Sequence, residues 1–400
     1  MISSSFHLLN RQNIITSTKG GVIVLSAYSA MQSSNDLAAK FTQEANFWYL
    51  TGINEPDWWL IIDGSKNKSW LVRPVISQSH QIFDGSLSDD VAIKTSGIDN
   101  IISNNEAMDL LKNLSRNHGF VYTLGNQPDA KYLDFCLNPS QKNLRKNLER
   151  LFSEVQDCRL ELSKLRAIKH IEEVTAIKKA IKLTVGAFED VKVKLPSLSY
   201  EYEVEAEFSY YFRKNGSVGH ACDPIVASGL NACTLHYNDN DAKFKKRDLL
   251  LLDICARLGG YASDISRTYK ISQPTTRQIE VHGVVNEARQ RIMDIIHPGL
   301  PILEYQRQSD EIMKYALNKI NLLNSNSDFR KYFPHAISHG LGVDIHDSLG
   351  RLNELLPGMV LTVEPGIYIP EEGIGVRIED DVLVTDSGHT NLSAALSTEL

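Results

Sequence analysis

The sequence predicts an α/β protein built from two domains. A chain of 400 residues exceeds what one ordinary hydrophobic core accommodates. Its first 155 or so residues contain short apolar runs of strand character mixed with helical patterns, and the part after Asp223 alternates strands with long helices. We therefore expect an N-terminal domain at residues 1–160 and a C-terminal domain at residues 161–400, with the boundary near residues 155–168.

The N-terminal domain is predicted to hold a modest sheet. Compact apolar runs, bounded by Gly, Asn, Asp or Lys, have the length and composition of strands and cover residues 22–25, 58–62, 70–75 and 121–124. Trp58 and Trp59 stand beside an Asn-Glu-Pro turn, and we expect them in the core rather than at an interface. No glycine-rich phosphate loop opens a helix in this domain, so nucleotide binding has no support.

Helical patterns dominate the start of the C-terminal domain. Apolar residues recur at spacings of three and four from Ile171 through Phe188, which predicts one apolar stripe along a helix that Pro196 stops. A second helix is expected at residues 200–214, with Gly216 just past its end. Two further long helices are expected at residues 275–296 and 301–319.

A predicted β-hairpin carries a pair of aspartates. Residues 248–258 and 261–269 flank Gly259-Gly260, a two-residue turn signal. If the turn centres there, Asp253 lies opposite Ser266, and Asp264 lies opposite Cys255. Asp253 and Asp264 then share one face as diagonal neighbours, with Cβ atoms about 7–8 Å apart. The alternative is a pair of exposed carboxylates, but the apolar run at residues 249–252 favours burial.

The last third of the chain adds further ionisable residues in apolar or glycine-rich surroundings. His339 lies in Ser-His-Gly-Leu-Gly, and Glu364 ends a strand-like run before Pro-Gly. Glu379 lies in the run 376–384, where a solvated acidic turn is the competing interpretation. Buried carboxylates are costly unless a positive charge compensates them, and four of them carry roughly the charge that two divalent cations balance. The pattern therefore predicts a two-metal site.

Composition argues against several classes of partner. The net charge of −7 and the pI near 6.0 disfavour nucleic acid and anionic membranes. No run of 18 apolar residues predicts a membrane span, and the N-terminus lacks the pattern of a secretory signal. The five cysteines show no CxxC spacing, so we expect reduced, mostly buried thiols in a cytoplasmic protein.

The motifs around these residues resemble the signature blocks of the pita-bread metallopeptidases, and more narrowly the aminopeptidase P (Xaa-Pro aminopeptidase) and prolidase branch. The C-terminal blocks are Leu-Leu-Asp253, Ser-Asp264-Ile-Ser-Arg-Thr, Ser-His339-Gly-Leu-Gly-Val-Asp-Ile-His346-Asp, Val-Glu364-Pro-Gly-Ile-Tyr368 and Val-Arg377-Ile-Glu379-Asp-Asp. Residues 225–237 resemble that branch's block with a substrate-side histidine, here His236. Residues 46–56 resemble the creatinase/aminopeptidase P N-terminal domain, so the resemblance covers nearly the whole chain.

The resemblance implies a creatinase-like N-terminal α/β domain followed by a pita-bread catalytic domain. It further implies two divalent metal ions held by Asp253, Asp264, His339, Glu364 and Glu379. Oxygen-rich ligation with one imidazole favours manganese, with cobalt or zinc as alternatives. Relatives of this kind are commonly homodimers or homotetramers, and their partners are proline-containing peptides.

The implied reaction is hydrolysis of the N-terminal Xaa-Pro bond by a hydroxide that bridges the metals. Glu364 is the expected proton shuttle, and His236 or His346 is expected to donate a hydrogen bond to the oxyanion. His335 and His346 are candidates for the proline side of the substrate. Tyr368 and Arg377 are expected to orient ligands or to line the pocket.

Several related functions stay open at this point. Prolidase, which cleaves only Xaa-Pro dipeptides, shares every predicted metal ligand. Methionine aminopeptidase usually lacks the N-terminal domain, creatinase lacks the metal ligands, and a catalytically silent binding protein would be expected to have lost them. The connection between His346 and Pro357 is shorter than expected for bacterial aminopeptidase P enzymes, so the preferred peptide length is left open.

Overall fold

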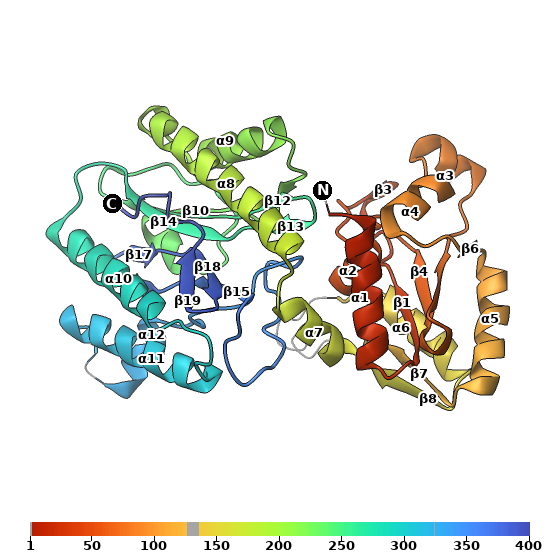
Figure 1. Ribbon diagram of the computed structural model, residues 1–400. Helices are drawn as coiled ribbons and strands as arrows, with labels where there is room; N and C mark the ends of the chain where they lie inside the picture. Colours follow the sequence, from red (N-terminus) through yellow and green to blue (C-terminus); the bar gives the residue numbers. More distant parts are fainter. Residues whose placement is uncertain (1, 126–135, 324) are drawn as a thin grey trace. The chain divides into compact units, whose positions relative to one another are not determined.

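The structure, a computed structural model, describes residues 2–125, 136–323 and 325–400 (Figure 1). The chain divides into two compact units, one that runs to Leu165 and one from Arg166 to Leu400. Both units combine helices with β-sheet, so the predicted α/β class is confirmed. The two units are described in turn.

The first unit is built on a mixed sheet with the strand order β6-β5-β4-β1-β7-β8. Its strands are β1 (Val22–Ser26), β4 (Trp59–Asp63), β5 (Lys68–Val72), β6 (Ile101–Ile102), β7 (Phe120–Thr123) and β8 (Glu154–Asp157). β4 pairs antiparallel with β1 and β5, whereas the remaining neighbours pair in parallel. The predicted strand runs fall on β1, β4, β5 and β7, with their ends shifted by a few residues.

Helices cover this sheet. They are α1 (Ser4–Ser17), α2 (Ala45–Thr51), α3 (Gln78–Phe83), α4 (Asp89–Ser96), α5 (Asn104–Asn117) and α6 (Ser140–Glu149), with a small hairpin of β2 (Gln32–Ser34) and β3 (Leu37–Ala38). Leu111 of α5 and Leu144 of α6 pack with Val22 and Ile61 in one buried cluster. In Figure 1, α1 and α2 lie on the opposite side of β1 from α5. Burial from both sides explains why every residue of β1 is buried.

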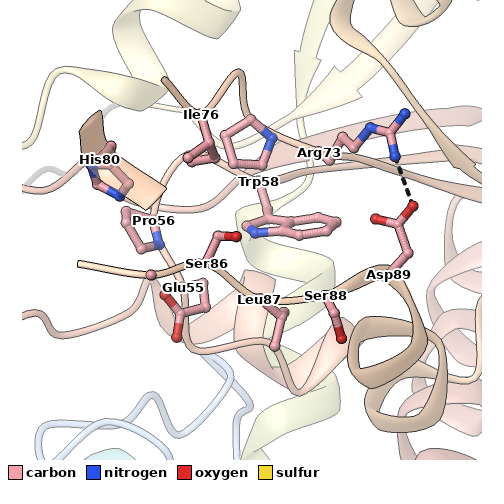
Figure 2. A pocket seen from close by; sticks show the side chains of 12 residues that line it. Glu55, Pro56, Trp58, Arg73, Ile76, His80, Ser86, Leu87, Ser88 and Asp89 are labelled. Carbon is pink, nitrogen blue, oxygen red and sulfur yellow. Dashed lines mark hydrogen bonds and ion pairs between the residues drawn. The ribbon is translucent and has the colours of Figure 1, made fainter. Parts of the chain in front are cut away.

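The two adjacent tryptophans are buried to different degrees. Trp58 is 2% exposed, as predicted for a core residue, and Trp59 packs half-buried against the cluster of α5 and α6. Trp58 also lines a pocket of about 340 Å³, whose wall includes an ion pair of 2.7 Å between Arg73 and Asp89 (Figure 2). None of the predicted site residues lines this pocket.

The second unit contains several small antiparallel sheets. One has the order β10-β11-β14, from β10 (Ile225–Ser228), β11 (Leu249–Ile254) and β14 (Ile265–Lys270); a second has the order β13-β12-β9, from β9 (Gly219–His220), β12 (Ala256–Leu258) and β13 (Tyr261–Ala262). A third joins β15 (Val360–Val363), β18 (Asp380–Thr385) and β19 (Gly388–Asn391), and β16 (Gly366–Ile369) pairs with β17 (Ile374–Arg377). One long hairpin, made of β11, β12, β13 and β14, contributes two strands to each of the first two sheets.

The helices of the second unit are α8 (Ile171–Lys194), α9 (Glu201–Lys214), α10 (Thr276–Asp294), α11 (Ile302–Lys319) and α12 (Asn326–Tyr332), and α7 (Arg159–Ala167) runs across the division between the units. The helices predicted near residues 200–214, 275–296 and 301–319 are confirmed. α10 and α11 bury Val285 and Met313 in one large cluster with Leu361 and Val376, and that cluster supports the strands of the site.

The buried stripe of helix α8 is shorter than predicted, because its first predicted residue is exposed. Ile177, Ile181 and Phe188 are buried as predicted, but Ile171 is 84% exposed. Ile171 occupies the first turn of α8, and the burial on this helix begins at Glu173, which accepts a hydrogen bond from Tyr261 at 2.9 Å. The stripe therefore begins later than the spacing of apolar residues indicates.

The cysteines depart from the prediction that all are reduced. Cys222 and Cys255 form a disulfide, although 33 residues separate them. Cys158 is buried, Cys233 is half-buried and Cys136 is exposed, each as a free thiol. The pairing arises because β9 and β12 lie side by side, which no local spacing signals. Among the described residues, no helix combines the length and apolarity needed to cross a membrane.

Candidate metal centre

The hairpin register places Asp253 and Asp264 as the sequence predicts. Asp253 pairs with Ser266 between β11 and β14, and Leu258 pairs with Tyr261 across the turn. The two turn residues are Gly259 and Gly260, with φ of 61° and 88°, so glycine at both positions permits a tight turn. The register keeps the two aspartates on one face of the hairpin.

Asp253 is held by a guanidinium. Arg377 Nη2 donates to Asp253 Oδ2 at 2.6 Å, while the other oxygen, Oδ1, is buried and has no hydrogen-bond partner among the described residues. An unsatisfied buried carboxylate oxygen is expensive without a cation or a donor beside it. Asp253 Oδ1 is therefore a candidate metal ligand.

His339 faces two carboxylates with one edge of its ring. Its Nδ1 donates to the carbonyl oxygen of Gly340 at 2.9 Å, which leaves Nε2 directed at Asp264 Oδ2, 3.4 Å away, and Glu364 Oε1, 3.6 Å away. A backbone acceptor on one ring nitrogen fixes the orientation that a metal-binding histidine requires. The backbone N–H of His339 donates to Thr362 Oγ1 at 3.1 Å.

Two short side chains hold the glutamates. Thr362, two residues before Glu364 and on the same face of the chain, donates from Oγ1 to Glu364 Oε1 at 3.2 Å. Ser266 donates from its hydroxyl to Glu379 Oε2 at 2.7 Å. Glu379 lies between β17 and β18, with 2% of its surface exposed. The competing interpretation of a solvated acidic turn at Glu379 is therefore wrong.

Four of the five predicted ligands, all but Glu364, fall in two overlapping groups, one of which also contains Cys255. Ligand atoms of Asp264, His339 and Glu379 all lie within 4.8 Å of one another, and so do ligand atoms of Asp253, Cys255 and Asp264. Asp264 belongs to both groups. Asp264 would therefore be available to both cations of a two-metal site.

Burial and mutual repulsion shift the acids of this cluster toward their neutral forms. Burial, with the nearby charge of Asp253, raises the pKa of Asp264 to about 6. Burial raises the pKa of Glu364 to about 7, and burial beside Asp264 and Glu364 raises the pKa of Glu379 well above its usual range. Burial alone would lower the pKa of His339, but the Asp264 and Glu364 carboxylates outweigh it and raise that pKa to about 9. The cluster thus has too little positive charge for its carboxylates.

Other buried acids in the same unit are compensated differently. Asp380 is paired with Arg267 at 2.7 Å and also with Arg289. Asp347 is paired with Arg166 at 2.9 Å and with Lys169 at 3.2 Å. Their cationic partners hold the pKa of both carboxyls below the usual value despite burial. Asp253, Asp264, Glu364 and Glu379 have mainly Arg377 and His339 as positive neighbours, so this donor set fits divalent cations.

The predicted substrate-side residues adjoin the carboxylates. Arg377 Nη1 donates to the Tyr368 hydroxyl at 2.9 Å, and that hydroxyl lies 2.9 Å from Nε2 of His335. Nδ1 of His335 is 3.5 Å from Glu364 Oε2. Burial, followed by the charge of Arg377, lowers the pKa of His335 to about 4, so this ring is neutral at pH 7.

His346 packs edge-on against His339, with ring centroids 4.5 Å apart. Burial, followed by the charges of His339 and His236, lowers the pKa of His346 to about 4. His236 itself is exposed, on the segment that follows β10. All the predicted site residues therefore belong to one neighbourhood of the second unit.

Three functional candidates were missed by sequence reasoning. Cys255 belongs to a ligand group, and Ser266 and Thr362 hold the glutamates. The predicted hairpin register already placed Ser266 opposite Asp253 and Cys255 opposite Asp264, so the signal was present for two of them. Thr362 could have been noticed because it lies two residues before Glu364 on a strand.

Two family models match the chain. Residues 175–386 match metallopeptidase family M24, and residues 7–122 match the aminopeptidase P N-terminal domain. The chain is 32% identical to an Xaa-Pro aminopeptidase of Escherichia coli (strain K12) over 94% of its own length and 91% of that protein. It is 31% identical to an Xaa-Pro aminopeptidase of Haemophilus influenzae, over 92% of this chain and 88% of the relative.

Solved structures agree with these sequence matches. The low-pH form of E. coli aminopeptidase P superimposes with a TM-score of 0.85 at 31% identity, covering 100% of this chain and 97% of that one. A zinc-substituted E. coli aminopeptidase P in complex with product gives a TM-score of 0.84 at 30% identity, covering 100% and 96%.

Proposed function

The chain belongs to metallopeptidase family M24, in its aminopeptidase P branch, and is a metallo-aminopeptidase; on that premise we propose that it releases the first residue of peptides whose second residue is proline, with the help of two divalent cations. The cations would be held by the residues Asp253, Asp264, His339, Glu364 and Glu379. The excess of buried carboxylates over cationic neighbours in this cluster is the observation that carries the proposal.

The donor set favours a hard or borderline metal. Four carboxylates and one imidazole suit manganese, and cobalt or zinc could bind the same ligands. Divalent cations bound there would supply an activated water as nucleophile and would polarise the scissile carbonyl. Every other part of the reaction depends on the chain's own side chains.

Glu364 is suited to carry a proton from the nucleophile to the departing proline nitrogen. Its carboxyl lies beside His339 and His335 within the cluster, where it can accept a proton from the attacking water and release it to the leaving nitrogen. Thr362 Oγ1 holds one of its oxygens at 3.2 Å, which fixes the carboxyl in position. His346 or His236 would donate a hydrogen bond to the oxyanion that develops on the carbonyl.

A proline in the second position changes what the site must recognise. The Xaa-Pro bond is a tertiary amide without an N–H, so peptidases that require that donor handle it poorly. The linked side chains of Arg377, Tyr368 and His335 would form a preorganised wall on the proline side. That wall would recognise the ring by shape.

Prolidase activity is the second candidate, and one feature favours it. The segment between His346 and Pro357 is short, and a short segment could close the site around a dipeptide. We further propose a cytoplasmic enzyme that forms a homodimer or homotetramer and has neither nucleic-acid nor membrane partners.

Product analysis by mass spectrometry tests the proposal. The purified protein is incubated with an Xaa-Pro dipeptide and with longer Xaa-Pro-Yaa peptides, with manganese or with chelator. We expect the first residue to be released from the longer peptides with manganese and no release with chelator. Cleavage of the dipeptide alone would establish a prolidase, and cleavage of neither substrate by metal-loaded protein would overturn the peptidase function.

A further inference from the structure

The disulfide between Cys222 and Cys255 lies at the edge of the candidate metal centre. Cys255 follows β11 directly and lies two residues beyond Asp253, so both side chains point to the same face of the strand. Its sulfur is 3.3 Å from Asp264 Oδ1. Ligand atoms of Asp253, Cys255 and Asp264 lie within 4.8 Å of one another. A sulfur in that position is within reach of a cation held by the two aspartates.

The backbone keeps the two cysteines together independently of the bond between them. Their Cα atoms are 5.9 Å apart, and the N–H of Ala221 donates to the Cys255 carbonyl at 2.7 Å. His220 pairs with Ala256 in the ladder between β9 and β12. Breaking the disulfide therefore leaves the backbone of Cys255 in place, with its side chain still on the face of the strand that carries Asp253.

We propose that the Cys222–Cys255 pair is a redox-controlled ligand of the metal centre. In the disulfide, the Cys255 sulfur is bonded to carbon and sulfur, and the centre offers oxygen and imidazole donors. After reduction, Cys255 becomes a thiolate ligand beside Asp253 and Asp264. This inference rests on the metal centre of the proposed function and adds a soft donor to it.

The chemistry is a two-electron thiol–disulfide exchange with a dithiol as the reductant. One thiolate of the dithiol attacks Cys222 Sγ, the S–S bond breaks, and its electron pair leaves on Cys255 Sγ. The second thiol of the reductant then displaces Cys222, and the reductant departs as a disulfide. Cys222 is the accessible sulfur because it is half-buried, whereas Cys255 is 1% exposed.

Reduction should change which metal the centre prefers. Thiolates favour zinc and other soft or borderline metals, whereas an oxygen-rich set with one imidazole suits manganese. We expect the preference for zinc over manganese to rise roughly 10- to 100-fold on reduction. Effects of this size on metal affinity are typical when the surroundings of a metal site change. The same protein would thus carry different metals in oxidising and reducing surroundings.

Cobalt(II) serves as the probe, because a thiolate ligand gives it a charge-transfer absorption in the near ultraviolet. Metal-free full-length protein is prepared oxidised and, separately, reduced with dithiothreitol that is then removed by desalting under argon. Alkylation and mass spectrometry count the free thiols in each sample, and Cys136→Ser checks that the count responds to one exposed thiol. We expect two additional alkylated cysteines, Cys222 and Cys255, after reduction.

The thiolate band is expected in reduced protein and in Cys222→Ser without reductant, and it is expected to be absent from oxidised protein and from Cys255→Ser. The unsubstituted protein in its reduced form tests the inference even where a variant fails to fold.

Cobalt binding without a thiolate band in reduced protein would overturn the inference and leave the proposed function intact. Failure of a mild oxidant to join Cys222 to Cys255 would overturn the redox control. Absence of cobalt binding from every sample would overturn the metal centre and the inference with it.

Discussion

Arg377 donates from Nη2 to Asp253 Oδ2 at 2.6 Å, and this ion pair ties the end of β17 to β11 in the middle of the carboxylate cluster. The same guanidinium donates to Ser266 and Tyr368, each at 2.9 Å. One side chain thus orients a predicted metal ligand, a residue that holds Glu379, and a residue of the proline-side wall. Its position suggests that it supports both metal binding and substrate orientation.

Replacing this guanidinium should be costly. We expect Arg377→Met to destabilise the metal-free protein by about 3–5 kcal/mol, because it removes one partner of a buried ion pair and leaves Asp253 uncompensated. Added manganese should recover part of that loss by supplying positive charge. Urea unfolding with and without manganese measures both effects. A metal-free variant as stable as the natural protein would contradict the role assigned to Arg377.

Neutralising Glu379 should abolish metal binding while leaving the stability of the metal-free protein nearly unchanged. Burial beside other acids disfavours the charged form of Glu379 and raises its pKa well above the usual range, so Glu379→Gln should change the stability of metal-free protein by less than about 1 kcal/mol. Activity and the stabilisation by manganese should both be lost, because an amide is a poor bridging ligand. Thermal unfolding with and without manganese measures this.

The matched control for Glu379→Gln is Glu280→Gln, an acid-to-amide change at a side chain that is 54% exposed on α10. That variant should keep both activity and stabilisation by manganese. Equal stabilisation of Glu379→Gln and the natural protein by manganese would remove Glu379 from the ligand set.

Metal-free protein should lose stability as the pH rises from about 4.5 to 7. Asp264 and Glu364 have pKa values raised to about 6 and about 7, so at these carboxyls the folded chain binds more protons than the unfolded chain. Glu173 and Glu379 add to this effect, which outweighs the opposite contribution of the buried histidines, whose pKa values are lowered to about 4. Stability then falls with rising pH, which is the reverse of the usual behaviour of paired carboxylates. Asp347 and Asp380, whose pKa values are lowered, titrate below this window.

Manganese should reverse the slope, since metal binding requires the deprotonated ligands and is tighter at higher pH. Thermal unfolding at several pH values, with chelator and with manganese, tests both signs. The same slope in both series would contradict the assignment of these carboxyls to the metal centre.

Two neighbouring aspartates offer a test of burial. Asp347→Asn should destabilise the protein by about 3–5 kcal/mol, because Arg166 and Lys169 would lose a fully buried partner. Asp344→Asn is the matched control: it pairs with the same Arg166, but its side chain is 52% exposed, so the loss should stay below about 1 kcal/mol. Urea unfolding of both variants at pH 7 gives the comparison. Equal losses would show that burial does not decide the strength of this network.

Much of the site could be predicted because its information is local. The Gly259-Gly260 turn fixes the pairing of Asp253 with Ser266, since side chains alternate with a period of two along both strands. Likewise, His339 and Glu364 stand out through the glycines and the Pro-Gly that surround them. The motif blocks then identify the family, and the family models agree.

Other features depend on segments that meet only in the folded chain. Cys222 meets Cys255 because β9 pairs with β12, and no spacing in the sequence encodes that contact. Ile171 continues an apolar stripe but is exposed, because the packing surface of α8 begins one turn later.

The sequence by itself thus determined the long helices of the second unit, the Gly-Gly hairpin and the candidate metal-binding residues, because each follows from periodicity or from a short motif. Only the tertiary structure decided which buried charges are compensated. Asp347 and Asp380 have arginine or lysine partners from distant helices and strands, whereas Asp264 and Glu379 face other acids. Electrostatic compensation depends on distance in space, and that distance is set by packing between segments far apart in the chain.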